Sequence, residues 1–473
     1  MSTLYRAGFT LSLLALSLAA QAQAPAPDDP SYINEVQSLP NVQKPVKGQA
    51  GAKGFFGDDT LTLTTRNFAA REIGQDRFGF TYPKNGSRHF THTRNTWVQG
   101  TALKYSSGYT QGTVGFGIDV AGFNAINLER GKGRIGGGGN RTLADSDGHG
   151  HDEWSKLGVA DVRLRVSNTE LKVGRFLIDT PVVSYNDNRA LPSSFTGFGI
   201  VSDEWDNLSL QAGSFRRASP RTGAGDEKFT TEYGTREVIG DHLSYLGGNY
   251  KPLDGLEISL YGAQFEDVWN QYYLGLSKTG GDIKTFGWKA AFNGYRTLDQ
   301  GDAKAGNINN TAWSMALTGS HQAHSLTFVY QQIEGNEYFD YAHETAAIYL
   351  GNSMFSDYNG PNEKSAQVRY ETDWSYFGVP GLTTGIWYVK GWDIDGTHYN
   401  PGSGNYANYA EVLQQDGETH HELGLVGTYQ VQSGRIKDSK FRLMLTRHKA
   451  SQNQVDGSFK EIRLVSTLPF NFL

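Results

Sequence analysis

The 473-residue sequence has no cysteine, and it has only 4 methionines and 14 prolines. An exported chain without cysteine cannot form mispaired disulfides in an oxidising compartment. After the N-terminal segment there is no run of about 18 apolar residues, so the sequence offers no membrane-spanning helix. The mean hydropathy of −0.50 looks like that of a soluble protein. It also suits a membrane barrel, because only alternate residues of each strand then meet lipid.

Signatures of catalysis are also scarce. No G-x-S-x-G or comparable motif appears, so a hydrolase stays an unsupported alternative. Gly131 to Gly136 match G-x-G-x-x-G, but the glycines that follow exclude the helix that a dinucleotide site needs. The Asp, His and Glu side chains of 145–153 lack a regular ligand spacing and are interpreted as a solvated loop. The pair His420–His421 is interpreted as structural.

The N-terminus predicts export. Arg6 precedes an apolar run, and Ala20 and Ala22 give the small-residue pattern of a signal-peptide cleavage site. We expect residues 1–22 to be the signal peptide, which changes the net charge from −6 to −7 by removing Arg6. Residues 23–53 are polar and contain several prolines, so they predict a flexible periplasmic lead-in. A single domain, 54–473, follows without a linker.

What is abundant indicates β-structure. The chain has 58 Gly, 25 Tyr, 25 Phe and 9 Trp, which suit turns and the aromatic girdles of an outer-membrane barrel. The last fourteen residues, 460–473, alternate between an apolar face that ends in Phe470 and Phe472 and a polar face with Arg463. Such a C-terminal strand is typical of barrel closure. If it closes a barrel, Arg463 points into the lumen.

The same alternation recurs along the chain, from Thr60 to the last residue, and predicts eighteen strands. Long irregular segments, among them 70–95 and 124–157, alternate with short turns, as expected for the extracellular and periplasmic ends of a barrel. We therefore predict an all-β fold, a transmembrane β-barrel of 18 antiparallel strands. Barrels of about 16–18 strands enclose an aqueous channel, which favours a pore.

Cations gather on the predicted inner face. Alternation alone puts seven of them there: Arg66, Arg163, Arg165, Lys172, Arg369, Arg442 and Arg463. A polar lumen wall with Arg paired to Asp or Glu explains any one of them about as well as a functional role does. Together they form a more specific signal, because a row of guanidinium groups lowers the energy of an anion along its path.

These residues resemble the OprD (Occ) family of substrate-specific outer-membrane channels of Gram-negative bacteria, from Gly54 to Leu473. The resemblance rests on GFFGDDTLTLTTRN (54–67), SGYTQGTVGFGIDVAGF (107–123), SNTELKVG (167–174), LYGAQFEDVWNQYYL (260–274), YRTLDQGDAKAGNINNTAWS (295–314), NGPNEKSAQVRY (359–370), FGVPGLT (377–383), DIDGT (393–397) and VQSGRIKD (431–438). It implies a monomeric 18-stranded barrel in which two inward-folded constriction loops narrow the pore. It also implies uptake of small carboxylate-bearing nutrients along an arginine-rich basic ladder.

Carried over by position, the resemblance puts the ladder on Arg442 and Arg463, with Arg71 and Arg94 near the first two strands. Arg189 corresponds to an arginine of one constriction loop. On the other loop, the pattern matches Tyr341, Ser353 and Asp357. These three residues are implied to form an acidic, hydroxyl-rich side of the constriction, opposite Arg189.

The chain departs from the relatives that take basic amino acids. Met444 stands where such relatives carry an arginine, Thr428 where they carry a lysine, and Phe355 where the loop has a tyrosine. Fewer cations and a more apolar constriction favour a cyclic or aromatic monocarboxylate, with amino acids or peptides as further candidates.

The expected protein is thus a diffusive channel with no enzymatic activity, cofactor or metal and no nucleic-acid partner. Its other partners would be outer-membrane lipid, lipopolysaccharide and, during biogenesis, the barrel-assembly machinery. A general or oligosaccharide-selective porin is the main alternative. A secondary adhesin or structural role of the loops stays open.

Overall fold

A computed structural model describes residues 48–49, 51–84, 87–129, 151–233, 238–400, 402 and 412–473. The expected signal peptide, nearly all of the lead-in, the glycine-rich motif at 131–136 and most of the segment 145–153 lie outside these residues. Among the described residues, no helix is long and apolar enough to cross a membrane.

Eighteen strands form one antiparallel sheet. They are β1 (Thr60–Gln75), β4 (Thr93–Ser106), β5 (Val114–Asn127), β6 (Glu153–Val166), β7 (Thr169–Phe176), β8 (Ser194–Trp205), β9 (Leu208–Ser219), β12 (Leu243–Leu253), β13 (Leu256–Phe265), β14 (Trp269–Asp282), β15 (Phe286–Asp299), β16 (Asn309–His321), β17 (His324–Glu334), β18 (Lys364–Asp373), β19 (Leu382–Asp395), β20 (Asp416–Gln430), β21 (Lys440–Ala450) and β22 (Ser458–Asn471).

Four short strands and two 3-10 helices lie outside this sheet. They are β2 (Phe80–Lys84), β3 (Ser87–Thr91), β10 (Phe229–Thr230), β11 (Ile239–Gly240), η2 (Trp374–Phe377) and η4 (Val412–Gln414). β2 pairs with β3, and β10 pairs with β11. Both hairpins belong to long connections at one end of the sheet.

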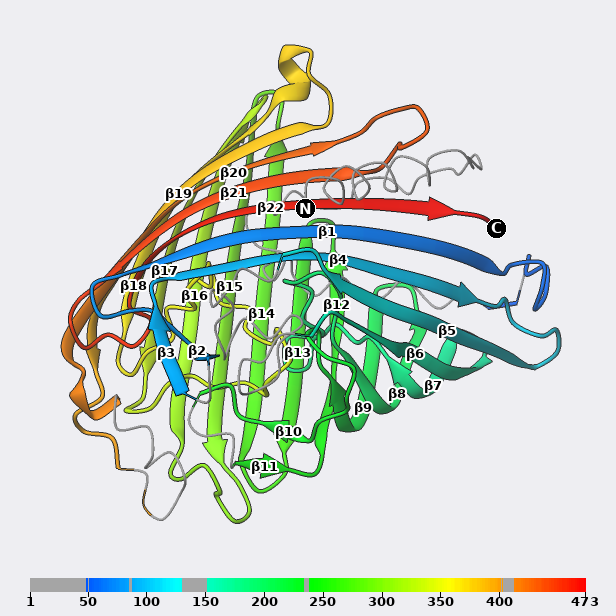
Figure 1. The fold of residues 1–473 in the computed structure, drawn as a ribbon. Coiled ribbons are helices and arrows are strands. Elements are labelled where there is room, and N and C mark those ends of the chain that lie inside the picture. The colour runs from blue at the N-terminus through cyan, green and yellow to red at the C-terminus, as the bar shows by residue number, and fades with distance from the viewer. Residues whose placement is uncertain are drawn as a thin grey trace.

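The sheet closes on itself. Each barrel strand pairs with the next along the chain, and β22 pairs with β1 over the register from Thr62↔Asn471 to Gln75↔Ser458. Figure 1 shows the first and last barrel strands, blue and red, side by side. Closure leaves no sheet edge, so the ladder of backbone hydrogen bonds continues around the whole wall, interrupted only at local register shifts. The predicted 18-stranded barrel is confirmed.

Alternation sets the two faces of the wall as expected. On β6, Val162, Leu164 and Val166 are exposed on the outside, whereas Arg165 between them is buried. On β18, Val368 is exposed and its neighbour Gln367 is buried. Apolar side chains outside and polar ones inside are what a barrel needs when lipid surrounds it and water fills it.

Several strands are longer than the sequence pattern predicts. β1 continues to Gln75, and β2 and β3 form a hairpin, inside the segment 70–95 that we expected to be irregular. β6 begins at Glu153, inside the expected irregular segment 124–157. These strand ends lack apolar alternation because they extend beyond the lipid layer. Backbone hydrogen bonds still join the strands there, but the outward side chains need not be apolar.

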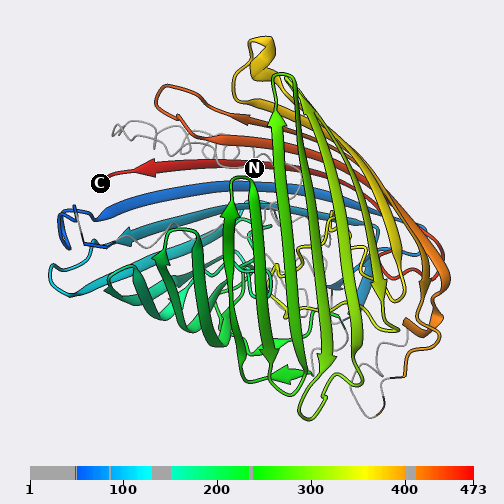
Figure 2. The ribbon, with the colours of Figure 1, turned by 180° about the vertical axis from the view of Figure 1, so that it is seen from behind.

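Two long loops fold into the barrel, as expected. The first constriction loop is 177–193, between β7 and β8, and the second is 335–363, between β17 and β18. The yellow tones of the second loop run inside the ring of strands in Figures 1 and 2. Tyr295 on β15 joins the two loops, because its hydroxyl donates to the Pro181 carbonyl (2.9 Å) and accepts from the Tyr349 N–H (3.0 Å).

The loops fill one side of the lumen. Inward aromatic side chains of β7–β9 and β12–β15 pack with both loops into one large buried cluster, which includes Phe195, Phe215, Trp269 and Tyr295. Burying this much apolar surface holds the loops against that wall. The opposite wall, formed by β19–β22, β1 and β4, is where the described loops leave a polar cavity.

Candidate functional site

A cavity of about 230 Å³ lies between the two constriction loops and the strands where the barrel closes. Its lining comprises Arg66, Phe68, Glu72, Arg94, Asp187, Asn188, Arg189, Met354, Phe355, Trp387, Arg442, Met444, Arg463 and Val465. Five arginines thus face two carboxylates, so cations predominate. The sequence prediction named all five arginines and Phe355.

Strand register arranges four of these arginines as a stair. The residues of β22 can be used to number the levels along the wall. Arg463 lies on β22 itself. In the strand register, Arg442 of β21 is opposite Val465 and Arg66 of β1 is opposite Thr467. Arg94 of β4 is opposite Glu72 of β1 in the strand register, and Glu72 is opposite Glu461 of β22. The four arginines therefore stand at the levels 461, 463, 465 and 467 on four neighbouring strands. Each step is two residues along the strand direction, or about 7 Å, and successive arginines also lie one or two strands apart.

Ion pairs fix three of the steps. Arg66 binds both carboxylate oxygens of Asp187 in the first constriction loop, at 2.5 and 2.9 Å. Arg94 forms a similar two-bond pair with Glu72, at 2.5 and 2.6 Å. Bidentate pairs hold a guanidinium in one orientation. Arg66 also donates to Thr467 Oγ1 and to the Arg189 carbonyl, which ties it to the first constriction loop.

Arg463 occupies the centre of the stair. Its Nε lies 2.7 Å from Glu461, and its guanidinium lies over the rings of Phe68 and Phe355, at 5.4 and 5.6 Å from their centroids. These two aromatic rings stabilise the cation without neutralising it. Phe355 therefore contacts Arg463 directly.

Arg189 projects from the first constriction loop into the same cavity. Burial lowers the pKa of Arg189 to about 9, and the neighbouring cations Arg221 and Arg463 act in the same direction. The guanidinium stays charged at neutral pH, because even the lowered pKa lies above 7. Five positive charges therefore surround this cavity.

Part of the cavity lining is apolar. Met354 and Phe355 come from the second constriction loop, and Trp387 comes from β19. Trp387 packs across Gly424 of the paired strand β20, where even an added Cβ would collide with the indole. A glycine is therefore required to seat the ring.

Tyr341, Ser353 and Asp357 lie close together, as expected, but they contact one another and do not face the arginine cavity. The hydroxyl groups of Tyr341 (2.7 Å) and Ser353 (2.9 Å) donate to Asp357 itself, as does that of Tyr233 (2.9 Å). Burial raises the pKa of Asp357, and these donors oppose the shift. Asp357 is not among the residues that line the arginine cavity; the loop residues that do so are Met354 and Phe355. The three residues thus shape the loop, and the hydroxyls are engaged within it.

Other predicted ladder positions lie elsewhere. Arg71 is exposed on the outer face of β1, paired with Ile462, because its position has the opposite parity to Arg66. Its expected place in the ladder is therefore wrong. Arg163 and Arg165 do face inward, but near the short turn 107–113, where both guanidinium groups lie over the Tyr109 ring.

Lys172 and Arg369 also face inward, outside the arginine cavity. Lys172 lies 3.5 Å from Glu170 on the same strand. Arg369 pairs with Glu371 at 3.2 Å and, together with Lys289, lines a larger cavity of about 660 Å³ toward the short-turn end of β14–β19. The carboxylates of Glu371 and Asp373 line the same cavity, so its lining is charged but not predominantly basic.

Sequence reasoning missed the counter-ions and one hydroxyl. Glu72 lies six residues after Arg66 and therefore on the same face of β1. Had the strand been predicted to extend this far, alternation would have placed Glu72 inside the barrel. Asp187 and Tyr233 sit in loops, where no periodic signal marks which side chain points inward. Trp387 has the inward parity of Val389, but its aromatic character suggested the lipid face equally well.

The buried Asp340 in the second constriction loop predicts a pH effect. It accepts the Tyr233 N–H at 2.9 Å, and burial raises its pKa from 3.8 to about 8. Between pH of about 4 and 8, Asp340 is protonated in the folded loop and ionised in the opened loop. The free energy of opening the loop therefore falls as the pH rises through this range, by on the order of a few kcal/mol. Hydrogen exchange across the loop, corrected for intrinsic rates, should show this loss. Asp340→Asn should abolish it, and the exposed Asp302→Asn should not; equal pH profiles for wild type and Asp340→Asn would contradict the assignment.

Comparison with known proteins gives a consistent result. Residues 53–472 match a family model described as outer membrane porin, OprD family. Porin D of Pseudomonas aeruginosa is 38% identical over 439 residues, which cover 90% of this chain and 94% of that protein. The crystal structure of P. aeruginosa OccD3 (OpdP) aligns with a TM-score of 0.82 at 63% identity, covering 95% of this chain and 100% of that one. The structure of P. aeruginosa OpdK with vanillate aligns with a TM-score of 0.76 at 28% identity, covering 89% and 100%.

Proposed function

Because this chain belongs to the OprD family of outer-membrane porins, we propose that it is a channel through which small carboxylates diffuse along the arginine stair. Family membership makes it a substrate-specific porin of the outer membrane, and its relatives are porins, which are channels and not enzymes. The carboxylate substrate and the route along the arginines are the proposal.

The observation that carries this proposal is the stair itself. Arg94, Arg463, Arg442 and Arg66 follow one another in two-residue steps beside a single cavity. A carboxylate can exchange one guanidinium for the next, whose level is about 7 Å further along the strand direction. Each site must bind weakly for transit to continue, and the ion pairs of Arg66, Arg94 and Arg463 provide the competition that prevents trapping.

The apolar wall favours a ring on the substrate. Met354, Phe355, Trp387 and Met444 line the same cavity as the arginines. Met444 adds no positive charge at the position where relatives that take basic amino acids carry arginine. A cyclic or aromatic monocarboxylate satisfies both sides of the cavity, because its ring packs on the apolar side while its carboxylate meets the guanidinium groups. The vanillate in the related OpdK structure is a molecule of this kind.

A matched pair of solutes tests the proposal in liposomes. Benzoate and benzyl alcohol share a ring and differ in charge. After subtraction of the uptake by protein-free liposomes, the channel should pass benzoate several times faster. Benzoate should also outpace lysine and a chitin disaccharide of similar width. Equal rates for benzoate and benzyl alcohol would show a general porin, whereas faster disaccharide uptake would show an oligosaccharide channel.

We further propose that the barrel acts as a monomer that contacts lipid and lipopolysaccharide and is inserted by the barrel-assembly machinery. The continuous apolar outer face supports lipid contact around the wall; Leu246, Leu260 and Leu317 there are 68%, 58% and 58% exposed. Cross-linking of the purified protein in bilayers should leave a single-chain species.

A further inference from the structure

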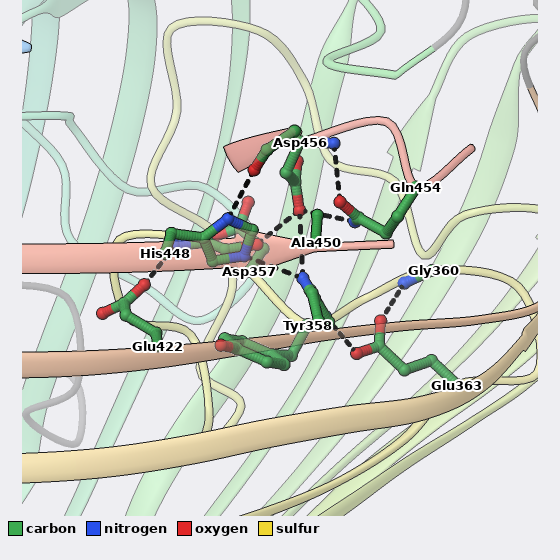
Figure 3. A network of polar contacts seen from close by, with 12 residues as sticks. Asp357, Tyr358, Gly360, Glu363, Glu422, His448, Ala450, Gln454 and Asp456 are labelled. Atoms are coloured by element: carbon green, nitrogen blue, oxygen red, sulfur yellow. Dashed lines mark hydrogen bonds and ion pairs between the residues drawn. The ribbon is translucent and has the colours of Figure 1, made fainter. Parts of the chain in front are cut away.

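A group of metal-ligand side chains lies behind the second constriction loop. His420 on β20, His448 on the paired strand β21 and Asp456 in the turn 451–457 offer ligand atoms that all lie within 4.8 Å of one another. The side chain of His420 is 1% exposed, and that of Asp456 is 31% exposed. Figure 3 shows His448 and Asp456 in this network together with Glu363 of the loop.

Outer hydrogen bonds fix the protonation of both rings. His420 Nε2 lies 2.6 Å from Glu363 Oε1, so this nitrogen carries the proton and donates it to the carboxylate. His448 Nδ1 lies 2.7 Å from the Gly457 carbonyl and must likewise be the donor. In neutral rings, His420 Nδ1 and His448 Nε2 are then both lone-pair acceptors.

These two acceptor nitrogens face each other at 3.0 Å. Two lone pairs at that distance repel, so the pair needs a positive charge between its members. Asp456 Oδ2 lies 3.6 Å from His420 Nδ1 and adds a negative charge to the same spot. Either an additional proton or a metal cation can supply the missing charge.

The geometry suits a metal. Zinc binds imidazole nitrogen at about 2.0–2.1 Å, so two such bonds at a tetrahedral angle separate the nitrogens by about 3.3 Å. A shift of a few tenths of an ångström from the present 3.0 Å suffices. Glu363 behind His420 gives the carboxylate–histidine–metal arrangement that orients metal ligands and raises their basicity. Ser356 Oγ (2.5 Å) and Gln454 Nε2 (2.9 Å) hold Asp456 in the same way.

We propose that His420, His448 and Asp456 bind a divalent transition-metal ion, with zinc as the reference ion, and that the bound ion holds the second constriction loop against β20 and β21. The ion reaches the site on the side of Asp456, the partly exposed ligand. Imidazole and carboxylate ligands suit zinc, copper and nickel and disfavour magnesium and calcium.

The site is connected to the arginine cavity. Phe459 packs on His448 with ring centroids 5.0 Å apart and on Phe355 at 4.6 Å. Phe355 in turn contacts Arg463. Metal binding should therefore steady the loop beside the stair, and it should lower the current noise of the open channel.

Binding is tested on tag-free, chelator-treated porin by calorimetry with zinc chloride. Wild type should bind one equivalent, and His448→Gln and Asp456→Asn should each weaken binding at least about tenfold. Glu363→Gln should weaken it by about 10- to 100-fold, as for other residues that support a metal ligand. His421→Gln removes the adjacent imidazole on the opposite face of β20 and should have no effect.

The double variant His149→Gln/His151→Gln removes the imidazoles of the acidic segment 145–153 and should also leave binding unchanged. X-ray absorption of zinc-loaded wild type should show two imidazole ligands, which tests the site even if a variant misfolds. Absence of stoichiometric binding, or binding that survives His448→Gln but is lost in the double variant, would overturn the proposal. None of these readouts depends on carboxylate transport.

Discussion

Replacing Arg442 and Arg463 together by alanine should lower the flux of a small carboxylate by at least about tenfold. Hydrogen bonds to a charged group contribute about 1.5–3 kcal/mol each, and about 1.4 kcal/mol corresponds to a factor of ten. The double variant removes two adjacent steps of the stair. It also leaves Glu461, whose Oε1 lies 2.7 Å from Arg463 Nε, as a buried carboxylate that repels anions.

The barrel itself should stay folded, because both side chains face the lumen and the strand ladder is unchanged. Arg447→Ala is the matched control: it removes one arginine from the same strand as Arg442, but from the exposed outer face. Benzoate uptake in liposomes and the heat-dependent mobility of the folded barrel on a gel give the two measurements. Unchanged benzoate flux in the double variant would remove the stair from the mechanism.

The second large effect is expected at Glu422, which anchors the second constriction loop. This fully buried carboxylate accepts hydrogen bonds from the Trp387 indole (2.8 Å) and from the backbone N–H groups of Ser356 (3.2 Å) and Phe355 (3.4 Å). Glu422→Leu leaves three buried donors without an acceptor, and each costs about 1–3 kcal/mol. The loop should detach from the wall, so that conductance rises and the preference for benzoate over benzyl alcohol is lost.

Glu422→Gln offers the conservative comparison. Its amide oxygen can still accept from the indole and the loop backbone, so most of the selectivity should return. Planar-bilayer recordings give conductance and noise on the same channels. If Glu422→Leu keeps the conductance and selectivity of the wild type, then the loop does not depend on this anchor.

Strand faces could be predicted from the sequence because a barrel strand meets lipid on one side and water on the other. Alternation placed Arg66, Arg442 and Arg463 inside, where the structure has them. Arg71 was assigned by resemblance alone and conflicts with the parity of its own strand. Where alternation and resemblance disagree about the face on which a side chain lies, alternation decides. Successive side chains of a strand point to opposite faces, so the lipid-facing residues fix the direction of all the others.

Loop geometry could not be predicted in this way. Asp187 reaches Arg66, and Tyr233 reaches Asp357, through tertiary packing that no local period records. The sequence likewise suggested an acidic lining near Asp357, whereas the loop directs Met354 and Phe355 toward the arginine cavity. The pair His420–His421 was interpreted as structural. The groups near His420, namely His448 and Asp456, are distant in sequence, and strand pairing brings them close to it.

The pairing of the first and last strands has a consequence for biogenesis. Arg66 and Arg94 come from the earliest part of the barrel to be synthesised, and Arg442 and Arg463 from the latest. The four guanidinium groups become neighbours only when β1 pairs with β22 and closes the barrel. A nascent or C-terminally truncated wall therefore cannot discriminate between solutes, and selectivity is the last property that this protein acquires as it matures.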